Sequence, residues 1–144
     1  MSLPNIYKPT KQYELIRIGK DNDGGYLCGT KNIKSANTLI SFGISEDWSF
    51  EKDFLKINHK VQLYCYDDVL SKALWFQRFW KDLGKLFYYF KIKPLLNSTR
   101  KYLDFLKFFS KNKLIKKRIG YNDVDTIFQN KNISRPVFFK IDIE

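Results

Sequence analysis

Four acidic residues at the ends of apolar, strand-like runs could do chemistry. Asp47 follows "LISFGIS", Asp67 and Asp68 close "VQLYCY", and Asp142 ends "VFFKI". In doubly wound α/β sheets, ligands bind outside the carboxyl ends of the strands, so acids at these positions would meet at one edge. A carboxylate there can accept ribose hydroxyls or remove a proton from a substrate. Each acid taken alone is better explained as a helix cap or a solvated strand end.

Other reactive residue types give weaker signals. Gly43 would let a ligand approach the backbone closely, but the chain lacks a full glycine-rich fingerprint. Cys28 and Cys65 lie in apolar segments without metal-ligand spacing, which predicts buried, reduced thiols. His59 stands alone in a polar turn, and no metal cluster is visible, so we expect no metal site.

The elements that would position these acids follow a strand, helix, strand pattern. Residues 13–30 predict a β-hairpin around an Asn/Asp/Gly turn. Residues 37–43 and 61–68 read as buried strands joined by a helix. Residues 137–141 read as a strand buried on both faces, and we expect the three strands to be parallel, with 37–43 in the centre. The residues expected to turn inward from the connecting helix are Phe50, Phe54, Leu55 and Ile57.

The segment 71–119 differs from the rest of the chain. Aromatic and aliphatic residues recur there at three- and four-residue steps, which predicts two amphipathic helices. We expect a break at Pro94 and "NST", with Asn97 or Ser98 capping the second helix. This helical insertion should cover the side of the sheet on which a ligand would bind. The residues expected to pack inward are Phe76, Phe79, Trp80, Leu83, Phe87, Phe90, Tyr102, Phe105, Leu106 and Phe109.

Length and composition indicate one globular domain, residues 1–144. The chain is 44% hydrophobic and 17% aromatic, which argues against disorder. Its net charge of +11 is concentrated in residues 71–119, which hold fourteen Lys or Arg and two acids. That segment could bind nucleic acid or an anionic membrane surface, although aromatic residues at helical spacing make nucleic acid the weaker alternative. With no signal-peptide or membrane-spanning stretch visible, we expect a cytoplasmic protein.

Several segments together resemble a known family. "NDGGYL", "LISFGISEDWSFE", "YCYDD", "DTIF" and "FFKIDIE" occur in the order and approximate spacing of S-adenosylmethionine-dependent methyltransferases of the FkbM type. The resemblance spans most of the chain apart from the aromatic, basic middle. It implies an α/β, Rossmann-like, mostly parallel sheet, with S-adenosylmethionine as cofactor. The methyl acceptor would be a small molecule or a sugar hydroxyl of a glycan or glycolipid.

The resemblance also implies roles for particular residues. The segment from Phe42 to Asp47 would wrap the methionine part of the cofactor, and Asp67 would hold its ribose. Asp142 would lie beside the sulfonium and the acceptor, and is the candidate catalytic residue. Ser45 stands where many such enzymes have a second glycine. The expected cofactor-binding set is Phe42, Gly43, Ile44, Ser45, Asp47, Asp67, Asp68 and Asp142.

The end of the chain carries a further expectation. In the family that it resembles, the strand matching "FFKIDIE" runs on into Gly and another acid, so Glu144 would lie inside a motif. We therefore expect this chain to be an incomplete methyltransferase domain with little activity of its own. An uncovered strand 137–141 would favour self-association through its edge. The alternative is a complete small domain that ends on an apolar strand.

Overall fold

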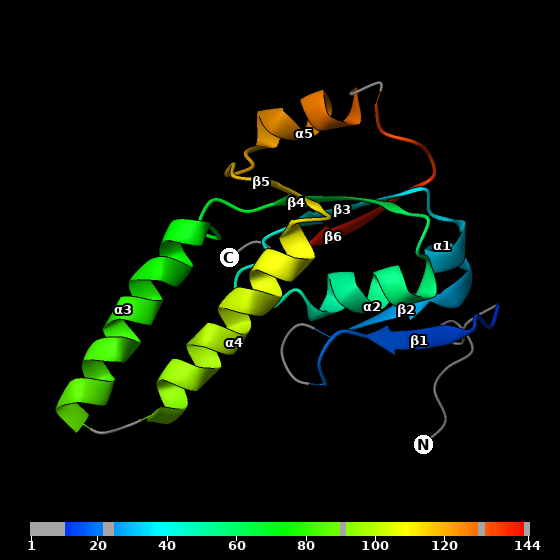
Figure 1. Ribbon diagram of the computed structural model, residues 1–144. Coiled ribbons are helices and arrows are strands. Elements are labelled where there is room, and N and C mark those ends of the chain that lie inside the picture. The colour runs from blue at the N-terminus through cyan, green and yellow to red at the C-terminus, as the bar shows by residue number, and fades with distance from the viewer. Residues whose placement is uncertain (1–10, 22–24, 90–91, 130–131, 143–144) are drawn as a thin grey trace, which may run out of the picture.

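A computed structural model describes residues 11–21, 25–89, 92–129 and 132–142. The described residues form a four-stranded parallel sheet, a separate antiparallel hairpin and five helices (Figure 1). The predicted α/β class is therefore correct. Three parts of the predictions lie outside the described residues: the turn residues 22–24, Phe90 and Glu144.

The predicted N-terminal hairpin is confirmed. Strand β1 (Leu15–Ile18) pairs antiparallel with β2 (Tyr26–Gly29). Alternate residues of a strand point to opposite faces, and Ile18 and Cys28 point into the main hydrophobic core. A short helix, α1 (Thr30–Ser35), follows directly, and the sequence pattern did not indicate it.

The larger sheet has the strand order β5-β4-β3-β6, with every pair parallel. Its strands are β3 (Thr38–Phe42), β4 (Gln62–Tyr66), β5 (Lys113–Ile115) and β6 (Val137–Ile141). The predicted parallel arrangement with 37–43 between its two neighbours is therefore confirmed. The chain runs from β3 outward through β4 to β5 and then crosses back to place β6 on the other side of β3, so the strand order reverses at β3.

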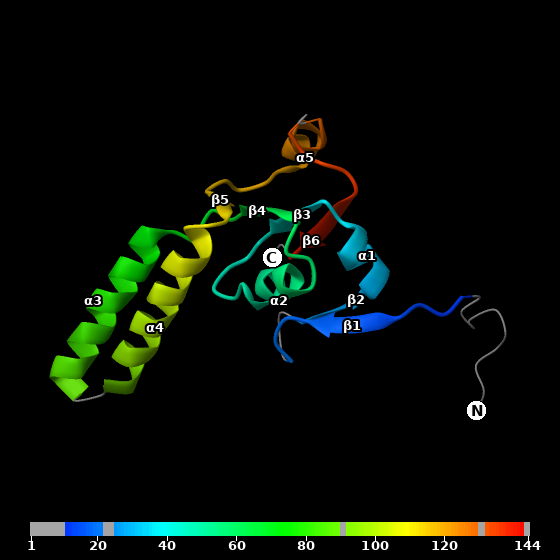
Figure 2. The ribbon, with the colours of Figure 1, turned by 45° about the vertical axis from the view of Figure 1, so that its right-hand side comes forward.

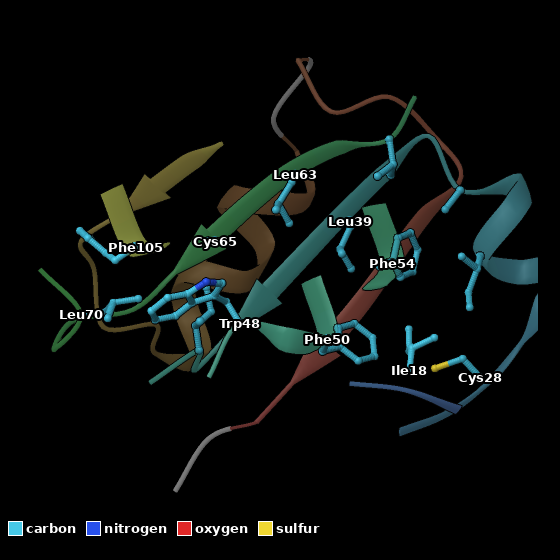
Figure 3. Packing of buried hydrophobic residues seen from close by; sticks show 14 of the residues in the cluster. Ile18, Cys28, Leu39, Trp48, Phe50, Phe54, Leu63, Cys65, Leu70 and Phe105 are labelled. Atoms are coloured by element: carbon cyan, nitrogen blue, oxygen red, sulfur yellow. The ribbon is translucent and has the colours of Figure 1, made fainter. Parts of the chain in front are cut away.

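Helices cover both faces of this sheet. Helix α2 (Ser49–Ile57) joins β3 to β4 and lies on the same side as α1, whereas α5 (Tyr121–Phe128) lies on the opposite side (Figure 1). Figure 3 shows Leu39 of β3 near Phe50 and Phe54 of α2 in the larger core cluster. A smaller cluster on the other face contains Ile40, Phe42, Tyr66 and Ile127. All five residues of β3 are buried, so this strand is covered on both faces, as its mostly apolar sequence predicts.

Strand β6 differs from its prediction as a strand buried on both faces. It pairs with β3 alone among the described strands, so it forms an edge of the sheet. Phe138 and Phe139 are half-buried, and Ile141 is exposed. The buried residue of this strand is Lys140, which apolar patterning could not indicate.

The segment 71–119 contains two long helices that lie side by side, α3 (Lys72–Tyr89) and α4 (Ile92–Phe109) (Figures 1 and 2). The predicted break at Pro94 is wrong, because α4 begins before it. Proline fits there, since a first-turn amide needs no partner within the helix. Ser98 lies inside α4 and donates its hydroxyl hydrogen bond to the Leu95 carbonyl, so neither it nor Asn97 is a cap. Residues 113–115 form β5, so the helical insertion ends earlier than predicted.

The helical phase of α3 also differs from the prediction. Among the described side chains of α3, Trp75 enters the core, whereas Phe76, Trp80 and Phe87 are exposed. Helix α4 contributes Phe105 to the core as predicted. Trp75 and Phe105 pack edge-on or tilted against each other and against Trp48, at the base of the two helices. None of the described helices combines the length and apolar character needed to cross a bilayer.

Candidate functional site

A pocket of about 350 Å³ opens at the carboxyl ends of the parallel strands. It brings together Gly43, Asp67, Asp68 and Asp142, which the sequence placed at strand ends on three different strands. Their meeting follows from the parallel order of β4, β3 and β6. The residues that line the pocket are Phe42, Gly43, Tyr66, Asp67, Asp68, Val69, Lys117, Arg118, Ile119 and Asp142.

Backbone hydrogen bonds of the sheet continue into the pocket. The Gly43 amide donates to the Tyr66 carbonyl at 3.1 Å, and the Asp142 amide donates to the Phe42 carbonyl at 3.1 Å. The Asp67 amide donates to the Ile115 carbonyl at 3.2 Å. Each strand is thus extended by one hydrogen-bonded residue, and these three residues lie at the same level of the sheet.

The turn after β3 uses left-handed backbone conformations. Gly43 has φ 66° and Ser45 has φ 51°. Glycine adopts such angles freely, whereas a residue with a Cβ atom is strained there. Ser45 therefore occupies a backbone conformation that favours glycine.

Asp67 is held by backbone donors on both carboxylate oxygens. Its Oδ2 accepts hydrogen bonds from the amides of Ile44 at 3.0 Å and Ser45 at 2.7 Å. Its Oδ1 accepts from the amides of Val69 at 2.9 Å and Leu70 at 2.6 Å. Two oxygens offer about four acceptor positions in total, and all four are filled. The predicted role of Asp67 as the ribose acceptor does not fit this geometry; Asp67 instead ties the turn after β3 to the turn after β4.

Asp68 is the acid in the pocket that faces solvent at the end of β4. It is exposed, and no hydrogen bond or ion pair holds it among the described residues. An exposed carboxylate at this position can accept two hydroxyls of a ligand without breaking a protein contact. The chemistry predicted for the end of β4 therefore fits Asp68.

Asp47 is not among the residues that line the pocket. Its Oδ2 lies 2.9 Å from Lys20 Nζ, and its Oδ1 accepts a hydrogen bond from the Ser49 amide at 3.0 Å. Partial burial raises the pKa of Asp47, but the hydrogen bonds from Lys20 and Ser49 outweigh it, so its pKa is lowered overall. Asp47 thus holds the turn that leads into α2, and the N-cap position of that helix is Trp48.

Ile44 and Ser45 follow Gly43, and their side chains do not line the pocket, so they contribute to the site less directly than predicted. The Ile44 side chain is buried in the main core, and Ser45 is exposed outside the pocket lining. Both donate their backbone amides to Asp67. Their part in the site is therefore to fix the turn that shapes it.

Behind Asp142 lies a buried ionic network that the sequence reasoning missed. Lys140 Nζ is 3.6 Å from Asp142 Oδ2 and 3.5 Å from Glu51 Oε1, and it donates to the Gly43 carbonyl at 3.5 Å. Glu51 Oε1 also accepts a hydrogen bond from the Ser41 hydroxyl at 2.5 Å. The sequence did contain a signal for this network. Lys140 lies inside an apolar strand, two residues before Asp142, and residues two apart in a strand point to the same face.

The loop after β5 forms one wall of the pocket, through Lys117, Arg118 and Ile119. Lys117 Nζ lies 2.6 Å from Asp123 Oδ1 at the start of α5. Among the described lining residues none belongs to α3 or α4, so the helices do not form the predicted cover over this site. The sequence missed this wall because residues 117–119 were assigned to the predicted helical insertion, 71–119.

Burial affects the pKa of three further side chains, Tyr66, Cys28 and Cys65. Burial raises the pKa of Tyr66, so its hydroxyl keeps its proton at neutral pH and can donate to a ligand. Cys28 and Cys65 are free and buried as predicted, and burial raises the pKa of both thiols. No three His, Cys, Asp or Glu side chains are grouped to hold a metal ion within the described ranges.

The arrangement suits a small polar ligand with an apolar portion. Phe42 and Tyr66, whose ring centroids are 5.4 Å apart, and Ile119 supply the apolar surface, while Asp68 and Asp142 supply acceptors. The volume lies within the range of about 300–1,000 Å³ typical of small-molecule sites. Comparisons of this chain with protein-family models, curated proteins and solved structures found no match.

Proposed function

We propose that this chain is a methyltransferase domain that binds S-adenosylmethionine in the pocket at the carboxyl ends of β3, β4 and β6. The observation that carries the proposal is the meeting of Gly43, Asp68 and Asp142 around one pocket. Taken in chain order, the parallel strands have the order third, second, first, fourth, as in a Rossmann-like sheet, and ligands of such sheets bind where that order reverses. The resemblance of "SFGISEDWSFE" and "KIDIE" to FkbM-type enzymes supports the same assignment.

The residues present fit this cofactor with one change from the sequence prediction. The positive φ of Gly43 keeps the turn free of a side chain where the ligand would approach the backbone. Asp68, which is exposed, would accept the ribose hydroxyls in place of Asp67. Phe42, Tyr66 and Ile119 would contact the adenine ring.

Asp142 is the candidate catalytic residue. S-adenosylmethionine supplies an activated methyl group, so the protein has to align an acceptor and remove its proton. The Asp142 side chain is 48% exposed at the pocket and can accept a proton or hydrogen-bond an acceptor hydroxyl. The nearby Lys140 ammonium keeps this carboxylate oriented at the end of β6.

For the acceptor we propose a hydroxyl of a small molecule or of a glycan sugar. The pocket is open to solvent beside Asp142, and such an acceptor could enter from that side. The two buried free thiols suit a reducing compartment, and we propose that the protein acts in the cytoplasm.

Calorimetry with S-adenosylhomocysteine tests the proposal without requiring turnover. The wild-type chain should bind it, and Asp68→Ala should weaken binding by about tenfold or more, because hydrogen bonds to a charged group are worth about 1.5–3 kcal/mol. Asp125→Ala, which removes an exposed acid from α5, is the matched control and should bind like the wild type. A folded chain without affinity for S-adenosylhomocysteine would overturn the proposal.

A further inference from the structure

The base of the α3–α4 pair is fixed to the rest of the protein, whereas most of its length projects away from the sheet (Figures 1 and 2). Arg78 of α3 pairs with Glu46, and Lys101 of α4 lies 3.8 Å from the same carboxylate. Asp104 accepts hydrogen bonds from Trp48 at 2.9 Å and from Lys52 at 2.5 Å. These contacts hold the helical pair at one end. No other described part of the chain packs on its outer surface.

Each of the two helices exposes a stripe of large apolar side chains. The stripe on α3 and the stripe on α4 have the same spacing, four residues and then seven. At about 100° per residue, each stripe spans only about 40° of its helix surface. Its members are Phe76, Trp80 and Phe87 on α3, and Ile92, Leu96 and Leu103 on α4, all of them more than half exposed.

Both stripes lie on the same face of the helical pair. Arg78 and Lys101 contact one carboxylate, Glu46, so they mark one face. Phe87 lies about 180° around α3 from Arg78, and Ile92 lies about 180° around α4 from Lys101. The other stripe residues are within about 40° of these directions. We therefore place the six apolar side chains on the face directed away from Glu46.

The same helices are strongly basic. Together α3 and α4 carry eight Lys or Arg and two acids, Asp82 and Asp104, and both acids pair with lysines. Five of the cations are exposed and form no ion pair with a described residue: Lys72, Lys81, Lys93, Arg100 and Lys107. An apolar face flanked by free cations matches the two layers of an anionic membrane surface, where apolar side chains enter the acyl boundary and long basic side chains reach the head groups.

We propose that the α3–α4 pair is a peripheral docking element that lays this apolar face on an anionic lipid bilayer. A second copy of the chain would bring two basic surfaces together, which like-charge repulsion opposes. A nucleic acid would match the charge but would leave the aliphatic stripe of α4 in water. The bilayer is the partner that satisfies both the charge and the apolar face. This inference does not depend on the proposed enzymatic function.

Trp80 gives a direct readout of docking. It is 55% exposed, whereas the other two tryptophans, Trp48 and Trp75, are 4% and 1% exposed. On titration with vesicles of phosphatidylcholine and phosphatidylserine, Trp fluorescence should shift to the blue, and the protein should sediment with the lipid. Trp80→Phe should retain sedimentation but lose the shift. Vesicles of phosphatidylcholine alone, or added salt, should reduce binding.

A triple substitution tests the apolar face. Phe76→Ser with Trp80→Ser and Phe87→Ser should lower the partition onto the anionic vesicles by about tenfold or more, since binding scales with buried apolar area. The matched control is Leu15→Ser with Leu27→Ser, which removes two exposed leucines from the β-hairpin and should bind like the wild type. Circular dichroism checks that each variant is folded.

Three results would overturn the proposal. The first is a wild-type chain that does not sediment with the anionic vesicles. The second is a folded triple-serine variant that binds them as the wild type does. The third is a wild-type dimer, seen by sedimentation velocity without lipid, that the triple substitution dissociates, because the apolar face would then belong to a second copy.

Discussion

Lys140 and Glu51 form an ion pair in the interior, with Nζ and Oε1 3.5 Å apart and both side chains almost fully buried. The pair links β6 to α2, and the Ser41 hydroxyl adds a contact from β3. The second Glu51 oxygen, Oε2, has no hydrogen-bond partner within the part of the chain that the structure describes. The Glu51 charge therefore depends on Lys140 to offset the cost of its burial, whereas Lys140 also has Asp142 Oδ2 at 3.6 Å.

Removing one member of this pair should destabilise the fold strongly. Lys140→Met leaves the Glu51 carboxylate buried without a cation, and we expect the free energy of unfolding to fall by about 3–5 kcal/mol. Urea denaturation measures the change. Lys60→Met, at an exposed lysine, should stay within about 0.5 kcal/mol of the wild type. Equal values for the two variants would contradict the role given to the pair.

Substitutions of the neighbouring acids Asp67 and Asp68 should differ in their effect on stability. Asp67→Ala removes the acceptor of four backbone amides, so we expect a loss of at least about 3 kcal/mol in unfolding free energy. Asp68→Ala removes an exposed side chain and should change stability by less than about 0.5 kcal/mol. Thermal and urea unfolding of the two variants, side by side, check this. A stable Asp67→Ala variant would show that the four amides find other acceptors.

The positive φ of Ser45 predicts an order of stability for substitutions there. Ser45→Gly should be neutral or stabilising by up to about 1 kcal/mol, because relief of the left-handed strain outweighs the flexibility that glycine adds to the unfolded chain. Ser45→Val should lose about 1–2 kcal/mol, since a β-branched residue tolerates this conformation poorly. Urea midpoints rank the three proteins. If valine proved as stable as glycine, the turn would have to adopt another conformation.

Glu46 should contribute to the acid sensitivity of the fold. The hydrogen bond from Arg78 is the main cause that lowers the pKa of Glu46 below its ordinary value of 4.5. A carboxyl with a lowered folded pKa adds stability above its ordinary pKa, and that stability disappears as the pH falls through the folded pKa. Glu46→Gln should therefore lose less unfolding free energy than the wild type between neutral pH and about pH 3. Glu14→Gln, at an exposed acid, should follow the wild-type profile.

Trp75 and Trp80 lie five residues apart on α3, and truncating them should lower the free energy of unfolding by very different amounts. Trp75→Ala opens a cavity next to Trp48 and Phe105, and we expect a loss of about 3–5 kcal/mol. Trp80→Ala removes an exposed side chain and should cost less than about 0.5 kcal/mol. Denaturant titration of both variants tests the helical phase. Comparable losses would indicate that Trp80 is covered in solution.

The sheet could be predicted from the sequence because its signals are local. The run from Thr38 to Phe42 is mostly apolar and does not alternate with charged residues, which is typical of a central parallel strand, and the acids that follow the strands mark one edge. The hairpin 13–30 likewise carries its turn residues in sequence. Strand β5 was missed because three residues after a helix give too short a pattern to read.

The site was harder to predict because its geometry depends on groups that the sequence does not distinguish. Every residue except proline has a backbone N–H group, so nothing in "YCYDD" tells that four amides converge on Asp67 and leave Asp68 to the solvent. The phase of α3 posed the same problem. Trp75 and Phe76 are adjacent and equally apolar, and Trp48, which selects Trp75, lies in a distant part of the chain.

The two long helices interrupt a connection between neighbouring strands, β4 and β5, and this has a consequence for how the protein can change over evolution. A parallel crossover has only to return the chain to the sheet, and the entropy of closing it rises slowly with its length. Beyond the base that Trp75 and Phe105 fix in the core, helices α3 and α4 can therefore be shortened or extended without altering the register of β4 and β5. Like a domain insertion at a tolerant position, they form a module whose properties can diverge while the sheet and its pocket stay constant.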